Sequence, residues 1–190
     1  MIALPPVTRA DAGNLASAAA GIIGARLTAV IYHYLPPVDG SAYAGGGDGV
    51  DADLTAIVLD LEERGLRTIT WAMEGELEGI SVLGDDAPYS GLADNAVEAT
   101  SREAWREHIS DTITSIGAAW QVSGDGCPES LWAIRLDFLC GSIVVALGTV
   151  DRDIEYMPDE LVVVFDPMLA SAYRPRHVSD SAWGQTIEPE

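Results

Sequence analysis

The stretch LTAIVLDL at residues 54–61 matches the stretch LWAIRLDF at residues 131–138, and both follow the pattern L-x-A-I-x-L-D with an apolar residue after it. Both stretches are apolar and rich in residues that favour β-strands. Successive side chains of a strand point to opposite faces of a sheet. Ile57 and the apolar residues two and four positions after it therefore share one face, and we expect that face in the core. Asp60 and its counterpart Asp137 fall on the opposite face.

The segments around the two stretches follow the same order, with a helix, a strand and a loop before each stretch and further strands after it. The first half is expected to contain a helix at 8–23 and strands at 25–35, 54–62, 66–74 and 77–83. The second half is expected to contain a helix at 101–113, strands at 116–122, 131–139, 142–150 and 160–165, and a short helix at 167–173.

The connections between these strands are short, and short connections join antiparallel neighbours. The sequence therefore predicts a mostly antiparallel α+β protein, built as a single domain over residues 1–190. The matching order of elements predicts an internal duplication with related helix-plus-sheet halves at 8–86 and 101–170. Residues 174–190 are expected to form a loosely ordered tail.

Charge is the strongest compositional signal, because thirty acidic residues face ten basic ones and give a formal net charge of −20. All ten basic residues are arginine. Such a polyanion repels nucleic acid and anionic membrane surfaces, and it attracts basic proteins. The alternative is that the charge serves solubility or growth at high salt and has no partner.

The chain contains no uninterrupted apolar run of 18 residues, and its first residues lack the basic and apolar regions of a secretory signal. We therefore expect no membrane span and a cytoplasmic location. Cys127 and Cys140 are expected to be free thiols of a reducing compartment, with a disulfide as the alternative.

The first candidate binding site is the acidic segment WAMEGELEG at 71–79. Glu74, Glu76 and Glu78 lie at a predicted hairpin tip, with Trp71 nearby as an apolar anchor. Together they could contact a basic protein surface. The alternative is a solvated turn.

The second candidate is formed by Asp48, Asp51 and Asp53, in the glycine-rich segment at 36–53 that we expect to be a loop. Carboxylates at this spacing could bind calcium, but the segment lacks the full calcium-loop pattern and its closing glutamate. We therefore expect no metal or other cofactor, and we assign these residues to partner binding or to a solvated loop.

Catalytic motifs are absent from the sequence. His33, His108 and His177 are not at metal-ligand spacing, no serine lies in a G-x-S-x-G motif, and no residue near either cysteine in sequence would activate its thiol. We therefore expect a non-catalytic protein. An enzyme with an unfamiliar site, in the segment 36–53 or between the halves, remains the alternative.

The tail carries the densest basic cluster of the chain, formed by Arg174, Arg176 and His177. In so acidic a protein we expect this cluster to form internal salt bridges and not to bind nucleic acid. Trp183 either packs back on the domain or anchors a partner.

In its acidity, size, β-rich α+β pattern and many Trp and Glu residues, the chain resembles bacterial immunity proteins of polymorphic toxin systems. The resemblance includes no diagnostic motif, so no site residues carry over from that family. It implies a small cytoplasmic protein that binds a basic toxin-like protein and blocks it. An acidic secretion chaperone or adaptor, dimeric and with an exposed apolar groove, is the other binding hypothesis.

Overall fold

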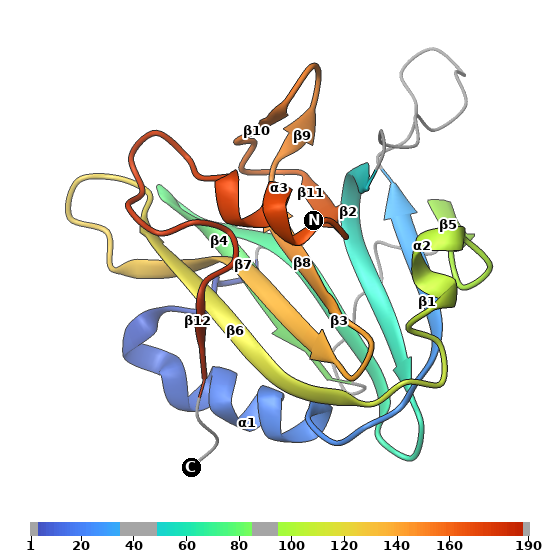
Figure 1. Ribbon diagram of the computed structural model, residues 1–190. Coiled ribbons are helices and arrows are strands. Elements are labelled where there is room, and N and C mark those ends of the chain that lie inside the picture. The colour runs from blue at the N-terminus through green and yellow to red at the C-terminus, as the bar shows by residue number, and fades with distance from the viewer. Residues whose placement is uncertain (1–3, 35–48, 85–94, 188–190) are drawn as a thin grey trace.

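The computed structural model describes residues 4–34, 49–84 and 95–187, and Figure 1 shows them as one strongly curled sheet with few helices. The strands of the main sheet are β1 (Leu27–Tyr34), β2 (Val50–Leu61), β3 (Gly65–Glu74), β4 (Leu77–Leu83), β5 (Ala96–Glu98), β6 (Ile113–Val122), β7 (Glu129–Phe138), β8 (Ser142–Leu147), β11 (Leu161–Val164) and β12 (Gln185–Thr186). A separate hairpin pairs β9 (Thr149–Val150) with β10 (Ile154–Glu155). The helices are η1 (Arg9–Asp11), α1 (Ala12–Ile22), α2 (Glu103–Arg106) and α3 (Pro167–Ala172).

All strand pairs of the sheet are antiparallel, which confirms the expected α+β class with mostly antiparallel strands. The relationship between the two halves stays a prediction.

The sheet branches at β2. One edge of β2 pairs with β1, whereas the other edge is shared by β11 along Val50–Leu54 and by β3 along Ala56–Leu61. The branch lies at a bulge, where Asp53 has a positive φ of 62° and the register with β1 shifts. An irregularity of this kind bends a strand, so β2 can serve both branches.

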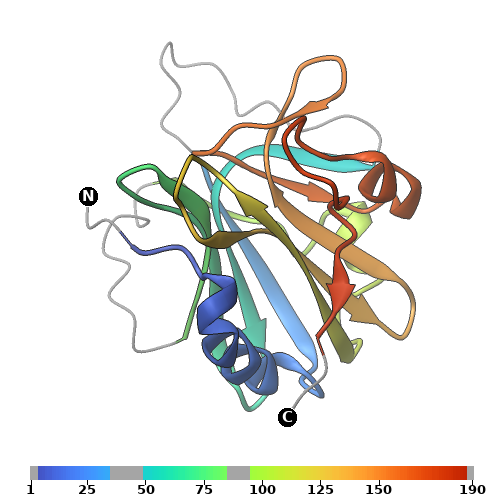
Figure 2. The ribbon, with the colours of Figure 1, turned by 90° about the vertical axis from the view of Figure 1, so that its left-hand side faces the viewer.

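Val7 joins the two branches at their far side. Its N–H donates to the Ile80 carbonyl at 3.0 Å, and its carbonyl accepts from the Leu131 N–H at 2.8 Å. Val7 thus links β4 to β7, and Thr8 makes an isolated bridge to Ser130. Figures 1 and 2 show the resulting curvature from two sides.

The core fills the inside of the curled sheet and includes the fully buried Trp105 and Trp132. Helix α1 lies along the lower end of the sheet in Figure 1. It buries Leu15, Ala19 and Ile22, whose spacing of four and three residues is that of one helix face. Among the described residues, no helix has the length and apolar character needed to cross a bilayer.

The helix expected at 101–113 is wrong for most of its length, because only α2 forms and β6 begins at Ile113. Backbone pairing with the start of β1 explains the difference. Leu27 N–H donates to Asp111 O at 3.0 Å, and Ile113 N–H donates to Ala25 O at 3.0 Å. These long-range bonds and the β-branched residues around Thr112 favour the extended chain.

Two further segments differ from expectation. Val50 already belongs to β2, so the expected loop ends earlier than residue 53, and β5 is a strand that is not among those expected from the sequence. The tail is held to the domain, because β12 pairs with β6 and both Val178 and Ala182 are buried.

Candidate functional site

The upper end of the sheet in Figure 1 is formed by three segments, the turn 74–77 between β3 and β4, the turn 123–128 between β6 and β7, and residues 148–160 with the β9–β10 hairpin. We call these three segments the acidic end. Its exposed carboxylates are Glu74, Glu76, Asp125, Asp151, Asp153, Glu155 and Asp159.

The first predicted site lies in this region. Glu74 and Glu76 are exposed on either side of Gly75, whose φ of 63° is the left-handed conformation that a glycine adopts readily. Ser123 holds this turn from the neighbouring one, since its hydroxyl accepts from the Glu78 N–H at 3.1 Å and donates to the Glu76 carbonyl at 3.0 Å. The two acidic turns are therefore fixed against each other.

Glu78 begins a chain of polar contacts that ends at His177. Its Oε2 accepts a hydrogen bond of 2.9 Å from the Tyr156 hydroxyl, which in turn accepts from Gln121 Nε2 at 2.9 Å. Gln121 Oε1 lies 3.2 Å from His177 Nε2. Because Gln121 donates through its amide nitrogen, its oxygen must accept, so His177 carries a proton on Nε2. Burial raises the pKa of Tyr156 far above its ordinary value, and the hydroxyl stays protonated as this arrangement requires.

A hollow of about 400 Å³ opens beside this chain, between the β10 segment and the start of the tail. Its lining residues are Ile154, Glu155, Tyr156, Tyr173, Arg174, Pro175, Arg176 and His177. Tyr156 and His177 are in edge-to-face contact with ring centroids 5.4 Å apart.

Trp71 is not an exposed anchor, because it is only half-exposed and packs against the core. Its Nε1 is buried and has no hydrogen-bond partner in the described part of the chain. Trp71 therefore supports β3 from within, and the acidic end offers carboxylates without a large aromatic residue at its tip.

The second predicted site is not a loop, since Asp51 and Asp53 both belong to β2; Asp48 lies outside the described residues. Asp51 forms an ion pair with Arg102 at 3.0 Å and accepts from the Tyr32 hydroxyl at 2.8 Å. Its side chain is 15% exposed. The Asp51 carboxylate is thus occupied inside the protein, where it holds α2 against β1.

Asp53 lies at the bulge of β2, close to the acidic end. Its Oδ1 accepts from Thr149 at 3.4 Å. Burial, together with the nearby Asp53 and Asp159 charges, raises the pKa of Glu160, and Glu160 Oε2 has no hydrogen-bond partner among the described residues. Like charges are therefore crowded where the end of the sheet meets the β9–β10 hairpin.

Ion pairs among the described residues are few and lie away from the acidic end, apart from Arg9–Glu129 beside it. They join Arg9 to Glu129, Arg26 to Glu62, Arg102 to Asp51 and Arg135 to Asp137. The prediction that Arg174 and Arg176 form internal salt bridges is wrong for the described part of the chain, because neither guanidinium has a carboxylate there within 4 Å. Arg174 instead donates to the Ser179 carbonyl at 3.3 Å.

A cysteine–histidine pair lies elsewhere, at the turn between β7 and β8. Cys140 Sγ is 3.1 Å from His108 Nδ1, and the Cys140 N–H donates to Asp111 at 2.9 Å. Burial and the Asp111 carboxylate raise the pKa of Cys140 to about 11, so its thiol is protonated at neutral pH. A nucleophilic cysteine needs the thiolate, and this pair does not supply it. Both cysteines are free, so the disulfide alternative is wrong.

Sequence reasoning missed Tyr156, Gln121 and the Cys140–His108 pair. Partners in these clusters are separated by 32 to 78 residues, so no local motif marks them. Within the residues that the structure describes, no group of three or more His, Cys, Asp or Glu side chains is placed to hold a metal ion.

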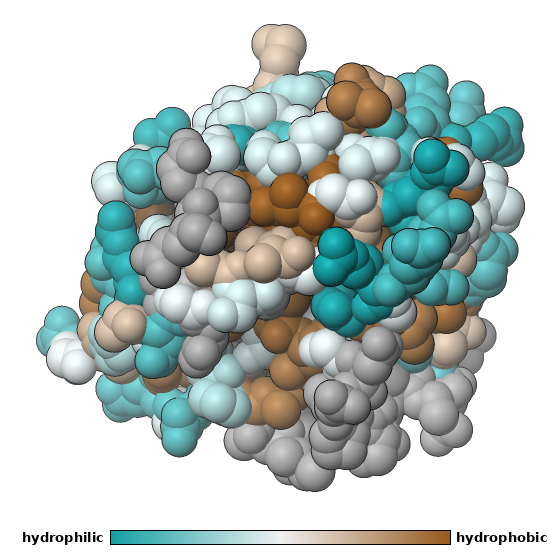
Figure 3. Space-filling view, turned by 90° about the horizontal axis from the view of Figure 1, so that it is seen from below, coloured by the Kyte–Doolittle hydropathy of each residue, from teal (hydrophilic) through white to brown (hydrophobic). Residues whose placement is uncertain are grey.

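The lower face of the molecule, which carries α1, has a different character. Seen from below in Figure 3, apolar residues run through the middle of this face, with hydrophilic residues towards its margins.

Comparisons with protein-family models, with curated proteins and with solved structures found no match to the chain.

Proposed function

We propose that the chain is a non-catalytic binding protein, which docks its acidic end onto a basic protein and thereby neutralises it, in the manner of an immunity protein or antitoxin. The observation that carries the proposal is the set of unpaired carboxylates at the acidic end. The exposed acidic residues of its three segments form no ion pair with a described basic residue.

Unpaired surface carboxylates repel one another, and a cationic partner relieves that repulsion when it binds. Complementary charge also accelerates the encounter of two proteins. Carboxylates spread over the chain would give only a diffuse field, whereas those on the acidic end project from three neighbouring segments. The described basic groups near them are Arg9, which pairs with Glu129, Arg152 in the hairpin and the cluster at 174–177.

The acidic end is also preorganised, which lowers the entropy cost of binding. The Ser123 bonds fix the first turn to the second, and the Tyr156–Glu78 bond fixes the hairpin segment to β4. Three turns that would otherwise move separately thus present one surface.

The test is affinity capture from an extract of the native cell with three immobilised proteins. The first is the wild type, and the second is the triple variant Glu74→Gln, Glu76→Gln, Asp125→Asn. The third is a control with the same charge change elsewhere, Glu63→Gln, Glu98→Gln, Glu103→Gln. All six positions are exposed. We expect a basic protein that binds the wild type and the control, elutes with salt, and is lost from the triple variant.

Neutralisation is then tested by titrating the purified partner with wild-type chain. We expect its activity to fall to zero at a fixed stoichiometry, and the triple variant to leave the activity intact. Equal retention of the same proteins by both variants would overturn the assignment of the acidic end. Retention that resists salt but is weakened by polar substitutions on the lower face would instead support the chaperone or adaptor hypothesis.

A further inference from the structure

The hollow beside the acidic end has an unusual lining for so acidic a protein. Arg174, Arg176 and His177 all line it, and Glu155 is the one carboxylate among the described lining residues. Its volume of about 400 Å³ lies in the range of small-molecule sites. The size and lining together suit a small polar ligand.

The two arginines are available to a ligand, since neither has a carboxylate within 4 Å in the described chain. By contrast, Arg9, Arg26, Arg102 and Arg135 each pair with a carboxylate in the part of the chain that the structure describes. Among the described residues, the Arg174 guanidinium donates one hydrogen bond, to the Ser179 carbonyl, although a guanidinium has five N–H groups to offer. Both side chains are exposed at the hollow.

The other walls are fixed in place. The Tyr173 hydroxyl donates to the Leu147 carbonyl at 2.5 Å, and its ring packs edge-on against Trp132. Tyr156 is held by Glu78 and Gln121, and His177 by Gln121. The site is therefore built before any ligand arrives.

We propose that this hollow binds a small oxyanion with two or more negative charges, carried on phosphate or carboxylate groups. A guanidinium matches the geometry of either group through paired N–H donors. At least two charges on the ligand are expected, because a monoanion would gain too little from two arginines to overcome the repulsion of a chain with net charge −20. The site is independent of the protein-docking function proposed above.

The test is isothermal titration calorimetry of the intact chain with inorganic phosphate and, in a separate arm, with citrate, in a buffer whose other anion is chloride. We expect saturable binding of at least one probe with a dissociation constant of about 1 mM or tighter. The arm that binds more tightly distinguishes a phosphate-bearing from a carboxylate-bearing ligand.

The variants Arg174→Gln and Arg176→Gln should each weaken binding about tenfold, which corresponds to loss of one charge-assisted hydrogen bond. The matched control Arg64→Gln removes the same charge from the exposed turn between β2 and β3 and should leave binding unchanged. Thermal unfolding of each variant checks that it folds. Arg152→Gln is a second control, which removes a charge close to the acidic end but outside the hollow and should also leave binding unchanged.

Three results would overturn the proposal. The first is no saturable heat for either probe up to about 20 mM, twenty times the expected dissociation constant. The second is equal affinity in the wild type and in the double variant Arg174→Gln, Arg176→Gln. The third is equal weakening by Arg64→Gln, which would show that the anion senses net charge and not this hollow.

Discussion

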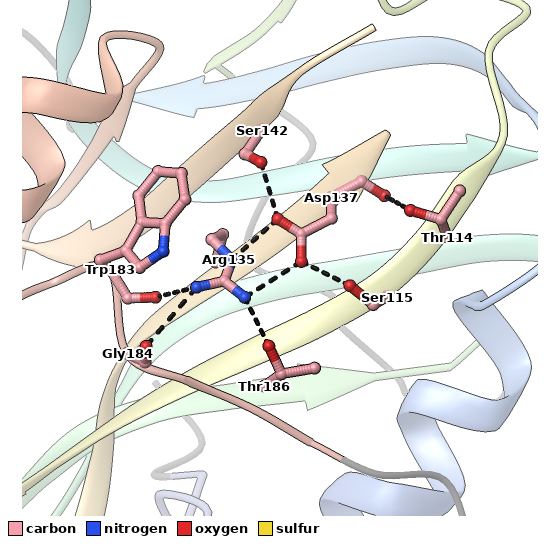
Figure 4. A network of polar contacts seen from close by, with 8 residues as sticks. All are labelled: Thr114, Ser115, Arg135, Asp137, Ser142, Trp183, Gly184 and Thr186. Carbon is pink, nitrogen blue, oxygen red and sulfur yellow. Dashed lines mark hydrogen bonds and ion pairs between the residues drawn. The ribbon is translucent and has the colours of Figure 1, made fainter. Parts of the chain in front are cut away.

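Arg135 and Asp137 stand two residues apart on β7, on the same face, and form an ion pair beneath the C-terminal segment (Figure 4). Arg135 Nε lies 2.8 Å from Asp137 Oδ1, and its Nη2 lies 3.1 Å from Oδ2. The same guanidinium donates to the Trp183 carbonyl at 2.8 Å and to the Thr186 hydroxyl at 2.8 Å. It also stacks on the Trp183 ring at 4.7 Å. One buried arginine thus attaches the tail to the sheet.

Replacing Asp137 with asparagine should destabilise the protein by about 3 kcal/mol, because it leaves the buried Arg135 charge without its partner. In the Asp137→Asn variant, amide hydrogen exchange should accelerate relative to the wild type, and more at residues 184–187 than in β7. The reason is that the tail is attached through the same guanidinium. The matched control is Asp60→Asn, at the corresponding position of the first sequence stretch. Asp60 is half-exposed, and a similar loss there would contradict the role given to Arg135.

The same pair predicts a dependence on pH. Burial acts to raise the pKa of Asp137, but hydrogen bonds from Arg135, Ser115 and Ser142 outweigh it, and the net pKa is lowered. A lowered pKa stabilises the fold above the ordinary aspartate value of about 3.9, and this contribution is lost as the pH falls through the folded-state pKa. The Asp137→Asn variant should therefore differ most from the wild type near neutral pH, and the two unfolding curves should converge in acid.

The pKa of Glu160 is shifted in the opposite direction from that of Asp137, so its effect on stability has the opposite dependence on pH. Burial raises its pKa, so its ionised form costs stability once the pH exceeds the ordinary glutamate value of about 4.3. The Glu160→Gln variant should therefore raise the melting temperature at pH 7, by roughly 1 to 3 °C for a chain of this size. The gain should shrink as the pH falls from the raised folded-state pKa towards 4.3, and it should be absent below that value. A gain that is equal at pH 3 and pH 7 would show that charge is not its cause.

Cys140 should react slowly with thiol reagents at neutral pH, although it is exposed, because its pKa is about 11. In a Cys127→Ser background, where Cys140 is the single thiol of the chain, the rate of alkylation should keep rising with pH up to about that value. Asp111→Asn should lower the midpoint of this profile and speed the reaction at pH 8. An unchanged profile would contradict the influence of Asp111 on the thiol.

At Gly79, β4 lies close against β7. A Cβ at this position would lie 2.8 Å from the Leu131 carbonyl oxygen and 2.8 Å from Pro6 Cβ. The Gly79→Ala variant should therefore lose about 1 to 3 kcal/mol of unfolding free energy in a denaturant titration. The control Gly13→Ala in α1 meets no atom within 4 Å and should gain up to about 1 kcal/mol from helix propensity.

The long strands could be predicted from the sequence, because a run of apolar residues that favour β-strands is a local feature. The stretches at 54–61 and 131–138 form β2 and β7, with the apolar residues buried as expected. The helix expected at 101–113 failed because the preference of that segment is decided by the edge of β1, some 80 residues away. The two-residue strand β12 carries no pattern at all, and its place depends on Arg135.

In the candidate site, too, the features that are local in sequence could be predicted and the long-range ones could not. The exposed carboxylates of the turn 74–77 could be predicted, since turn residues and charge are read directly from the chain. The hydrogen bond from Tyr156 to Glu78 joins residues 78 positions apart, and the hollow forms where β10 meets the tail. Such long-range arrangements depend on the way the sheet curls, which no local pattern encodes.

The position of Val7 between Ile80 and Leu131 has a consequence for the order of folding. Its bond to Ile80 can form once residue 80 has been synthesised, but its bond to Leu131 must wait through the synthesis of some fifty further residues, so the edge that Val7 offers to β7 stays open until then. Contacts so distant in sequence slow folding and leave an unpaired strand edge exposed in the meantime. The nascent chain should accordingly depend most on chaperones during that interval.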